Sequence, residues 1–199
     1  MKLTRAFYHN EDVVDIAQKL LGKLLCTNVN GKFTAASIVE TEAYCGATDK
    51  ACHAHLNRRT KRTEIMFGDG GYAYVYLCYG IHHLFNIVTN KSGKADAVLI
   101  RAVEPVEGIE TMLERRKMDK TAYRLTAGPG ILSQALGIKT SHYATDLTGS
   151  LIWLEDHKVI FNKNEIISSP RVGIDYAGED ALLPWRFRIA NNKWCSKAK

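Results

Sequence analysis

The stretch LLCTNVNGKFTAASIVETEAY, residues 24–44, decides the fold of this chain. Two runs rich in β-forming residues, 24–29 and 33–44, flank the dipeptide Asn30-Gly31. An Asn-Gly pair between two such runs is a strong hairpin signal, because both residues tolerate a positive φ. The sequence therefore predicts two antiparallel strands joined by a tight turn.

The stretch YAYVYLCYG, residues 72–80, begins a second predicted hairpin. Its strands are expected at residues 72–77 and 84–89, with the tip at residues 78–83. Pro105 is expected to end the strand that follows, because proline cannot donate to a strand ladder. The further strands are expected at residues 97–103, 151–154, 159–161 and 187–189.

Helical spacing of apolar residues occurs between these strands. The first helix is expected over residues 13–21, with Asn10 as its N-cap and Gly22 after its end. Two others are expected near residues 107–117 and over residues 129–136, the latter with Pro129 at its first position and Gly137 after its end. Because strands outnumber helices and are joined by hairpins, we expect an α+β fold. The expected architecture is a mostly antiparallel, curved sheet with flanking helices and a protruding β-hairpin.

The composition is that of a folded domain with a basic surface. A length of 199 residues fits a single domain over residues 1–199, and 46% hydrophobic with 24% charged residues excludes a disordered chain. The net charge of +6 and a pI near 9.0 favour polyanionic partners such as nucleic acid. The five cysteines contain no C-x-x-C pair, so a disulfide scaffold is not expected.

The N-terminus and the apolar runs indicate where the protein works. The first residues lack the apolar core of a signal peptide, and no apolar run approaches the ~20 residues that span a bilayer. We therefore expect a soluble, intracellular protein without a membrane partner. In a bacterium it would lie in the cytoplasm, with the nucleoid.

Four tyrosines crowd the second hairpin within eight residues. In a regular strand Tyr72, Tyr74 and Tyr76 share one face, which is an ordinary place for a tyrosine on a half-buried sheet. Tyr79 falls out of that phase at the tip, just before Gly80. A large ring there needs something to contact, and a wedge between base pairs is one such use.

Two carboxylates and a ring lie on one face of the first hairpin. Glu40, Glu42 and Tyr44 alternate along the strand, which places the carboxylates about 6–7 Å apart. Paired carboxylates at such distances hydrolyse glycosidic bonds, one activating water and the other acting as acid. The plainer alternative is a solvated or ion-paired strand residue, and the spacing does not choose which carboxylate acts.

The loop at residues 45–69 contains candidate metal ligands. Their spacing, C-x6-C-H-x-H, matches no common structural zinc pattern, so we expect neither a metal nor a cofactor. A metal-dependent hydrolase built on this loop remains a rival hypothesis. The candidate ligands are Cys45, Asp49, Cys52, His53 and His55.

Basic residues suggest two kinds of anion contact. The run that includes Arg58 and Arg62 is either a solvated loop or a set of phosphate contacts, which position a protein on DNA without specifying sequence. Arg101 ends an apolar strand, and a buried guanidinium needs a carboxylate or a phosphate as its partner.

Taken together, these runs resemble the alkyladenine (3-methyladenine) DNA glycosylase family. The most specific matches are ETEAY at residues 40–44 and YVYLCYG at residues 74–80. The chain departs from the family at Ala47 and His82, where members often have a proline and an aromatic residue. Weaker matches follow in order at residues 20–23, 66–67, 86, 99–105, 128–130, 134–136 and 170–174.

The resemblance implies release of damaged purines from DNA without a metal or a covalent intermediate. It assigns Glu42 as the general base that orients water against C1′ of a flipped nucleotide, with Arg101 near the water and the target phosphate. Tyr44 would stack on one side of the base, with His53 and Tyr76 on the other.

The same resemblance assigns the remaining pocket and DNA contacts. Met66 and Asn86 would belong to the base pocket, with Asn86 at its floor, where it would clash with the 2-amino group of guanine. Tyr79 would be the wedge that fills the gap in the duplex, and Glu40 would be structural.

The expected function is therefore that of a monofunctional DNA-3-methyladenine glycosylase. Its substrates would be 3-methyladenine, 7-methylguanine and hypoxanthine in double-stranded DNA, and it would act as a monomer by base flipping. The alternative is a non-catalytic nucleic-acid-binding module that uses the same aromatic residues for stacking.

Overall fold

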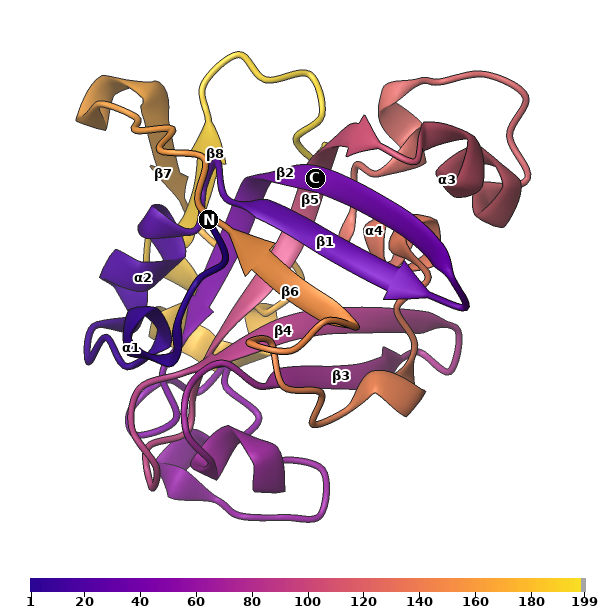
Figure 1. Ribbon diagram of the computed structural model, residues 1–199. Coiled ribbons are helices and arrows are strands. Elements are labelled where there is room, and N and C mark those ends of the chain that lie inside the picture. Colours follow the sequence, from indigo (N-terminus) through magenta and orange to yellow (C-terminus); the bar gives the residue numbers. More distant parts are fainter. Residues whose placement is uncertain (198–199) are drawn as a thin grey trace.

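Strands form the centre of the molecule. The computed structural model describes residues 1–197, and these contain one eight-stranded antiparallel sheet with the order β3-β4-β5-β2-β1-β6 (Figure 1). The remaining two strands pair with each other, and β8 also pairs with β2. The strands are β1 (Leu24–Val29), β2 (Lys32–Tyr44), β3 (Ala73–Cys78), β4 (His82–Thr89), β5 (Asp96–Glu107), β6 (Ile152–Glu155), β7 (Ile166–Ser169) and β8 (Arg186–Ile189).

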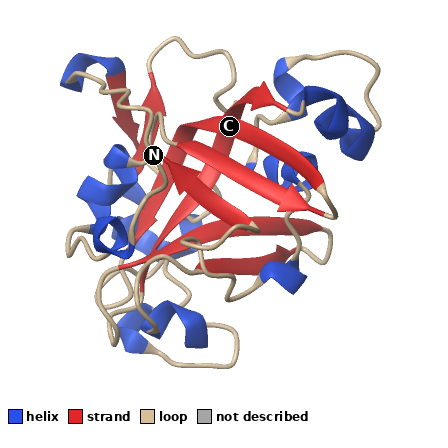
Figure 2. Ribbon diagram, in the orientation of Figure 1, coloured by secondary structure: helices blue, strands red, loops and turns tan. Residues whose placement is uncertain are grey.

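Helices lie around the margins of this sheet (Figure 2). Apolar residues of α2, α3 and α4 pack with the sheet in one main core, which confirms the predicted α+β class with a mostly antiparallel sheet. The α-helices are α1 (Arg5–Tyr8), α2 (Val13–Lys19), α3 (Ile109–Arg116) and α4 (Pro129–Leu136). The 3₁₀ segments are η1 (His55–Asn57), η2 (Glu64–Phe67), η3 (Tyr123–Leu125), η4 (Thr140–His142), η5 (Lys163–Glu165) and η6 (Asp175–Leu182).

Strand β2 is the long strand that carries the two carboxylates. The predicted hairpin between β1 and β2 is confirmed, and Asn30 and Gly31 have φ values of 56° and 72°. Further along, β2 lies between β5 and β8, and register shifts interrupt its pairing with β5 between Ile38 and Thr41. Glu40 and Glu42 are therefore in a part of the sheet that has neighbours on both edges.

The second hairpin is also confirmed, with β3 and β4 pairing from Ala73 to Cys78 and from His82 to Ile87. The amide of Ile81 donates to the Cys78 carbonyl oxygen at 3.1 Å across the turn. The side chains of Tyr79 and Ile81 are 89% and 70% exposed, so the tip projects from the body of the protein.

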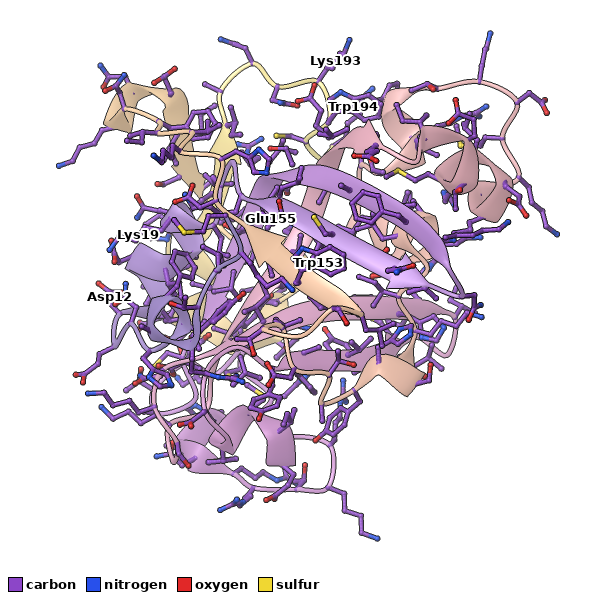
Figure 3. All side chains as sticks on the ribbon, in the orientation of Figure 1. Asp12, Lys19, Trp153, Glu155, Lys193 and Trp194 are labelled. Atoms are coloured by element: carbon purple, nitrogen blue, oxygen red, sulfur yellow. The ribbon has the colours of Figure 1, made fainter. Side chains whose placement is uncertain are left out.

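Helix α2 begins at Val13, but its N-cap differs from the predicted one. Its N-cap is Asp12, whose carboxylate accepts from the Val14 and Asp15 amides, whereas Asn10 accepts from the Asp12 amide. The prediction of Asn10 as the N-cap was therefore wrong, because its side chain forms a turn ahead of the helix. Asp12 and Lys19 mark the two ends of α2 in Figure 3.

Two strand predictions were also wrong. Strand β5 continues through Pro105 to Glu107, because β4 pairs with β5 only over residues 96–99 and proline is tolerated where a strand becomes an edge. Residues 159–161 form no strand, and Ile160 is 87% exposed. Strand β7 was not predicted.

Among the described residues, no helix has both the length and the apolar character needed to cross a membrane.

Candidate active site

Glu42 is fully buried beneath an aromatic pocket. The Tyr44 hydroxyl donates to its Oε2 at 2.8 Å, so the predicted alternation of β2 does place both side chains on one face. The Val172 amide donates to Oε1 at 2.8 Å, and Arg101 Nη1 lies 3.3 Å from the same oxygen. Two hydrogen-bond donors and the Arg101 guanidinium therefore fix the Glu42 carboxylate.

Glu40 is equally buried but belongs to an ion network. Its Oε1 accepts from Arg101 Nε at 2.9 Å, from Arg186 Nε at 2.7 Å and from Ser196 Oγ at 2.8 Å. Its Oε2 accepts from the Ser196 amide at 2.6 Å. Burial alone would raise the pKa of Glu40, but the two guanidinium groups and Ser196 hold that pKa below its usual value.

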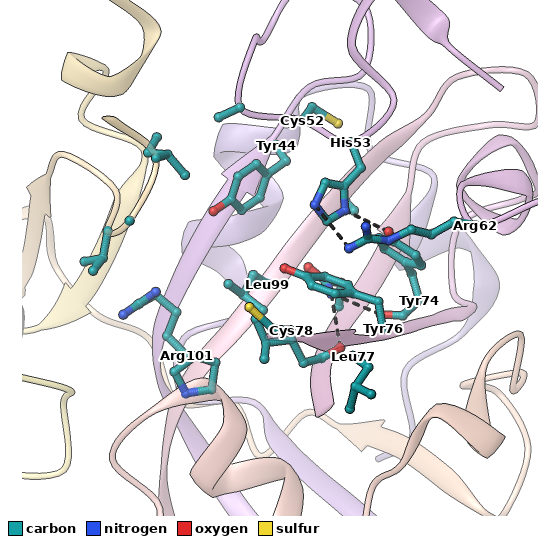
Figure 4. Close-up of a pocket in the computed structure, with 18 of the residues that line it drawn as sticks. Tyr44, Cys52, His53, Arg62, Tyr74, Tyr76, Leu77, Cys78, Leu99 and Arg101 are labelled. Atoms are coloured by element: carbon teal, nitrogen blue, oxygen red, sulfur yellow. Dashed lines mark hydrogen bonds between the residues drawn. The ribbon is translucent and has the colours of Figure 1, made fainter. Parts of the chain in front are cut away.

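The pocket beside Glu42 has a volume of about 490 Å³ and is walled by tyrosines (Figure 4). The structure brings together in its lining all five residues that were predicted for the base pocket, and Arg101 as well. These are Tyr44, His53, Met66, Tyr76, Asn86 and Arg101. Such a cavity accommodates a planar heterocycle.

His53 is held against two tyrosines. A hydrogen bond of 2.8 Å joins its Nδ1 to the Tyr74 hydroxyl, and its ring meets that of Tyr76 edge-on at 4.7 Å between centroids. Burial, assisted by the charge of Arg62, lowers the pKa of His53 to about 4. His53 is therefore neutral at pH 7, and Tyr74, which the sequence analysis placed only in the sheet, also forms part of the pocket wall.

Asn86 and Met66 lie deep in the pocket. Asn86 is buried, and its amide nitrogen donates to the Tyr74 carbonyl oxygen at 3.0 Å, which fixes the orientation of its side chain. Met66 is also buried. Both residues therefore shape the pocket from rigid positions.

The expected DNA-contacting residues occupy different places. Tyr79 lines the pocket mouth at the hairpin tip and has a φ of 50°, a conformation that costs a tyrosine about 1–3 kcal/mol. Arg62 also lines the pocket, with its guanidinium 4.5 Å from the centroid of the Tyr76 ring. Arg58 is exposed and lies outside the pocket lining.

Two of the candidate metal ligands, Asp49 and Cys52, have other partners. Asp49 forms a buried ion pair with Arg171, with contacts of 2.5 and 2.8 Å. Cys52 donates weakly to the Ala95 carbonyl oxygen, and burial raises the pKa of its thiol to about 12. Within residues 1–197, no group of three His, Cys, Asp or Glu side chains is placed to hold a metal ion.

Sequence analysis missed the residues that support Tyr44. The Arg171 guanidinium lies between the rings of Tyr44 and Trp185, 4.7 and 5.2 Å from their centroids. The adjacent Val172 supplies the amide that binds Glu42. The run at residues 170–174 was noted only as a weak match, since one sequence does not show which distant strand it contacts.

Comparisons with known proteins agree with this geometry. The family model described as "Methylpurine-DNA glycosylase (MPG)" matches residues 6–193. A protein of Alkaliphilus oremlandii is 47% identical over 204 residues, which cover 99% of this chain and all of the relative. Proteins of Natranaerobius thermophilus and Clostridium acetobutylicum are each 46% identical, and the matches cover at least 98% of this chain and 99% of each relative.

Each of these three relatives is named "Putative 3-methyladenine DNA glycosylase". The family match covers most of the chain and the relatives match it from end to end, which confirms the resemblance drawn from the ETEAY and YVYLCYG motifs. This chain belongs to the methylpurine-DNA glycosylase family of DNA-repair hydrolases.

Proposed function

We propose that residues 1–199 form one monofunctional DNA glycosylase domain that hydrolyses the N-glycosidic bond of 3-methyladenine, 7-methylguanine and hypoxanthine in double-stranded DNA. The observation that carries this proposal is the Glu42 carboxylate, fixed by Tyr44 and Val172 beside an aromatic pocket of about 490 Å³. The target nucleotide leaves the base stack first, because its glycosidic bond is out of reach inside a duplex.

Aromatic stacking holds the extruded base in this proposal. Tyr44 covers one side of the base, and His53 with Tyr76 covers the other; stacking contributes roughly 1–3 kcal/mol per base. Asn86 would meet the 2-amino group of a guanine ring, which disfavours undamaged guanine and makes 7-methylguanine, which carries the same group, the poorest fit of the three substrates. The neutral state of His53 avoids a positive charge against a methylated purine, which is itself cationic.

Glu42 acts as general base on a water molecule. The water oxygen bonds to C1′ while its proton goes to the carboxylate, and the electron pair of the broken bond stays on the departing purine. A methylated cationic purine becomes neutral as it leaves, whereas hypoxanthine must accept a negative charge or a proton. Arg101 holds the Glu42 carboxylate in place through its contact at 3.3 Å.

Tyr79 and the basic surface engage the duplex. The exposed Tyr79 ring enters the space that the flipped nucleotide vacates, and the strained turn keeps it extended from the tip. Arg58 contacts phosphates, in keeping with the net charge of +6. The protein acts as a monomer, and in a bacterial cell it works in the cytoplasm on nucleoid DNA.

Base release from defined duplexes tests this function. We expect purified protein to release 3-methyladenine, 7-methylguanine and hypoxanthine, with strand breakage only after alkali treatment. A non-catalytic binding module, the second candidate, would bind the same duplexes and release nothing. If chelators abolished base release, that result would instead support a metal-dependent hydrolase.

A further inference from the structure

Arg62 places a fixed positive charge in the wall of the pocket. Its guanidinium lies over the Tyr76 ring at 4.5 Å, and its Nη2 is 3.4 Å from His53 Nε2. Figure 4 shows Arg62 beside His53 and Tyr76, with Tyr44 on the other side of His53. No carboxylate of the described chain forms an ion pair with Arg62, so its charge is not neutralised locally.

The positive charge of Arg62 affects the pKa values of the groups around it. Burial is the main cause of the low pKa of His53, and the charge of Arg62 lowers it further. The same charge opposes the rise that burial causes in the pKa values of Tyr74 and Tyr76. A base in this pocket would therefore meet the positive field of Arg62.

We propose that Arg62 is a specificity-determining residue that favours release of neutral purines over cationic ones. The proposal rests on the base-release function given above. When the C1′–N9 bond of hypoxanthine breaks, its electron pair stays on a neutral ring, which becomes anionic until a proton arrives from water. The positive charge of Arg62 stabilises that developing anion.

A cationic methylpurine responds in the opposite way. Its ring is positive before the bond breaks and neutral afterwards, so Arg62 repels the bound base, and the relief of that repulsion on cleavage only restores what was lost on binding. The Tyr76 ring face already holds a cation, which reduces the attraction that it offers to a second one. Arg62 therefore favours hypoxanthine over the whole course from free duplex to transition state, because it opposes entry of a cationic base into the pocket and stabilises an anionic leaving ring.

Matched variants on the same loop test this inference. Arg62→Gln removes the charge from the pocket, Arg62→Lys keeps it, and Lys61→Gln removes an exposed charge from the neighbouring residue, which is absent from the pocket lining. Arg62 and Lys61 are both exposed, so these variants are expected to fold, which thermal melting verifies. Single-turnover release is measured at subsaturating enzyme on hypoxanthine and 7-methylguanine duplexes, so that the rate includes entry of the base into the pocket.

We expect Arg62→Gln to lower hypoxanthine release about tenfold while 7-methylguanine release changes less than about twofold, as for a partly exposed charge. Arg62→Lys retains most of the wild-type preference, and Lys61→Gln changes neither rate. Equal losses on both duplexes, or weaker binding to undamaged duplex without a change in preference, would show that Arg62 is only a phosphate contact. If the wild-type protein released neither base, the proposed function itself would fail; release of both with an unchanged ratio in Arg62→Gln overturns the Arg62 inference alone.

Discussion

Glu40 and Glu42 stand two residues apart on β2 and are equally buried, yet their surroundings differ. An ionised carboxylate offers about four acceptor positions. Glu40 accepts four hydrogen bonds, three at Oε1 from Arg101, Arg186 and the Ser196 hydroxyl and one at Oε2 from the Ser196 amide. Glu42 accepts hydrogen bonds only from Tyr44 and Val172 among the described residues, so it retains capacity for a water molecule.

Arg101 connects the two carboxylates. Its Nε donates to Glu40, while its Nη1 lies 3.3 Å from Glu42. Burial disfavours the charged form of Arg101, but Glu42 and Glu40 together keep its pKa above the usual value. Two identical residues at the same depth therefore differ in the number of donors that hold them, and this difference is the structural basis for proposing Glu42 rather than Glu40 as the general base.

The largest expected effect is that of Glu42→Gln on base release. Gln keeps the shape of the side chain but cannot take a proton from water, so release at saturating enzyme should fall about 10³-fold, near 4 kcal/mol. Binding to lesion-containing duplex should remain. Single-turnover release and gel-shift titration measure the two properties. Release at the wild-type rate would end the assignment of Glu42 as general base.

Glu40→Gln tests whether Glu40 stabilises the fold through its ion pairs with Arg101 and Arg186. The substitution leaves the buried Arg186 without a carboxylate partner and Arg101 with Glu42 alone, so the free energy of unfolding should fall by about 3 kcal/mol. Urea unfolding measures this loss, and Glu42→Gln is the matched control, with a smaller change in stability. A Glu40→Gln protein as stable as wild type would contradict the ion network.

The pH dependence of stability sharpens the same prediction. The pKa of Glu40 in the folded protein lies below its ordinary value of 4.5, so its contribution to stability is complete above that value. That contribution is lost as the pH falls through the folded pKa. Urea midpoints measured from pH 6 downward should therefore decline less steeply for Glu40→Gln than for the wild-type protein.

The sequence predicts the position of Glu42 beside Tyr44 better than it predicts the hydrogen-bond donors that distinguish Glu40 from Glu42. Asn30-Gly31 fixed the hairpin, and strand alternation placed Glu42 beside Tyr44, because both signals are local. The apolar strand before Arg101 predicted that its guanidinium needs an anionic partner. It did not identify that partner. The donors that distinguish Glu40 from Glu42 come from residues more than a hundred positions away, and local pattern does not contain such contacts.

The smallest expected effect is that of Tyr44→Phe, which removes one donor from Glu42 and keeps the stacking ring. A hydrogen bond to a carboxylate contributes about 1.5 kcal/mol, so release at saturating enzyme should fall roughly tenfold, with lesion binding preserved. Tyr74→Phe is the matched control, because it removes a pocket hydroxyl that bonds His53 and not Glu42. If both variants lost the same activity, the hydroxyl of Tyr44 would matter only to the packing of the pocket, and the donors of Glu42 would no longer explain how it differs from Glu40.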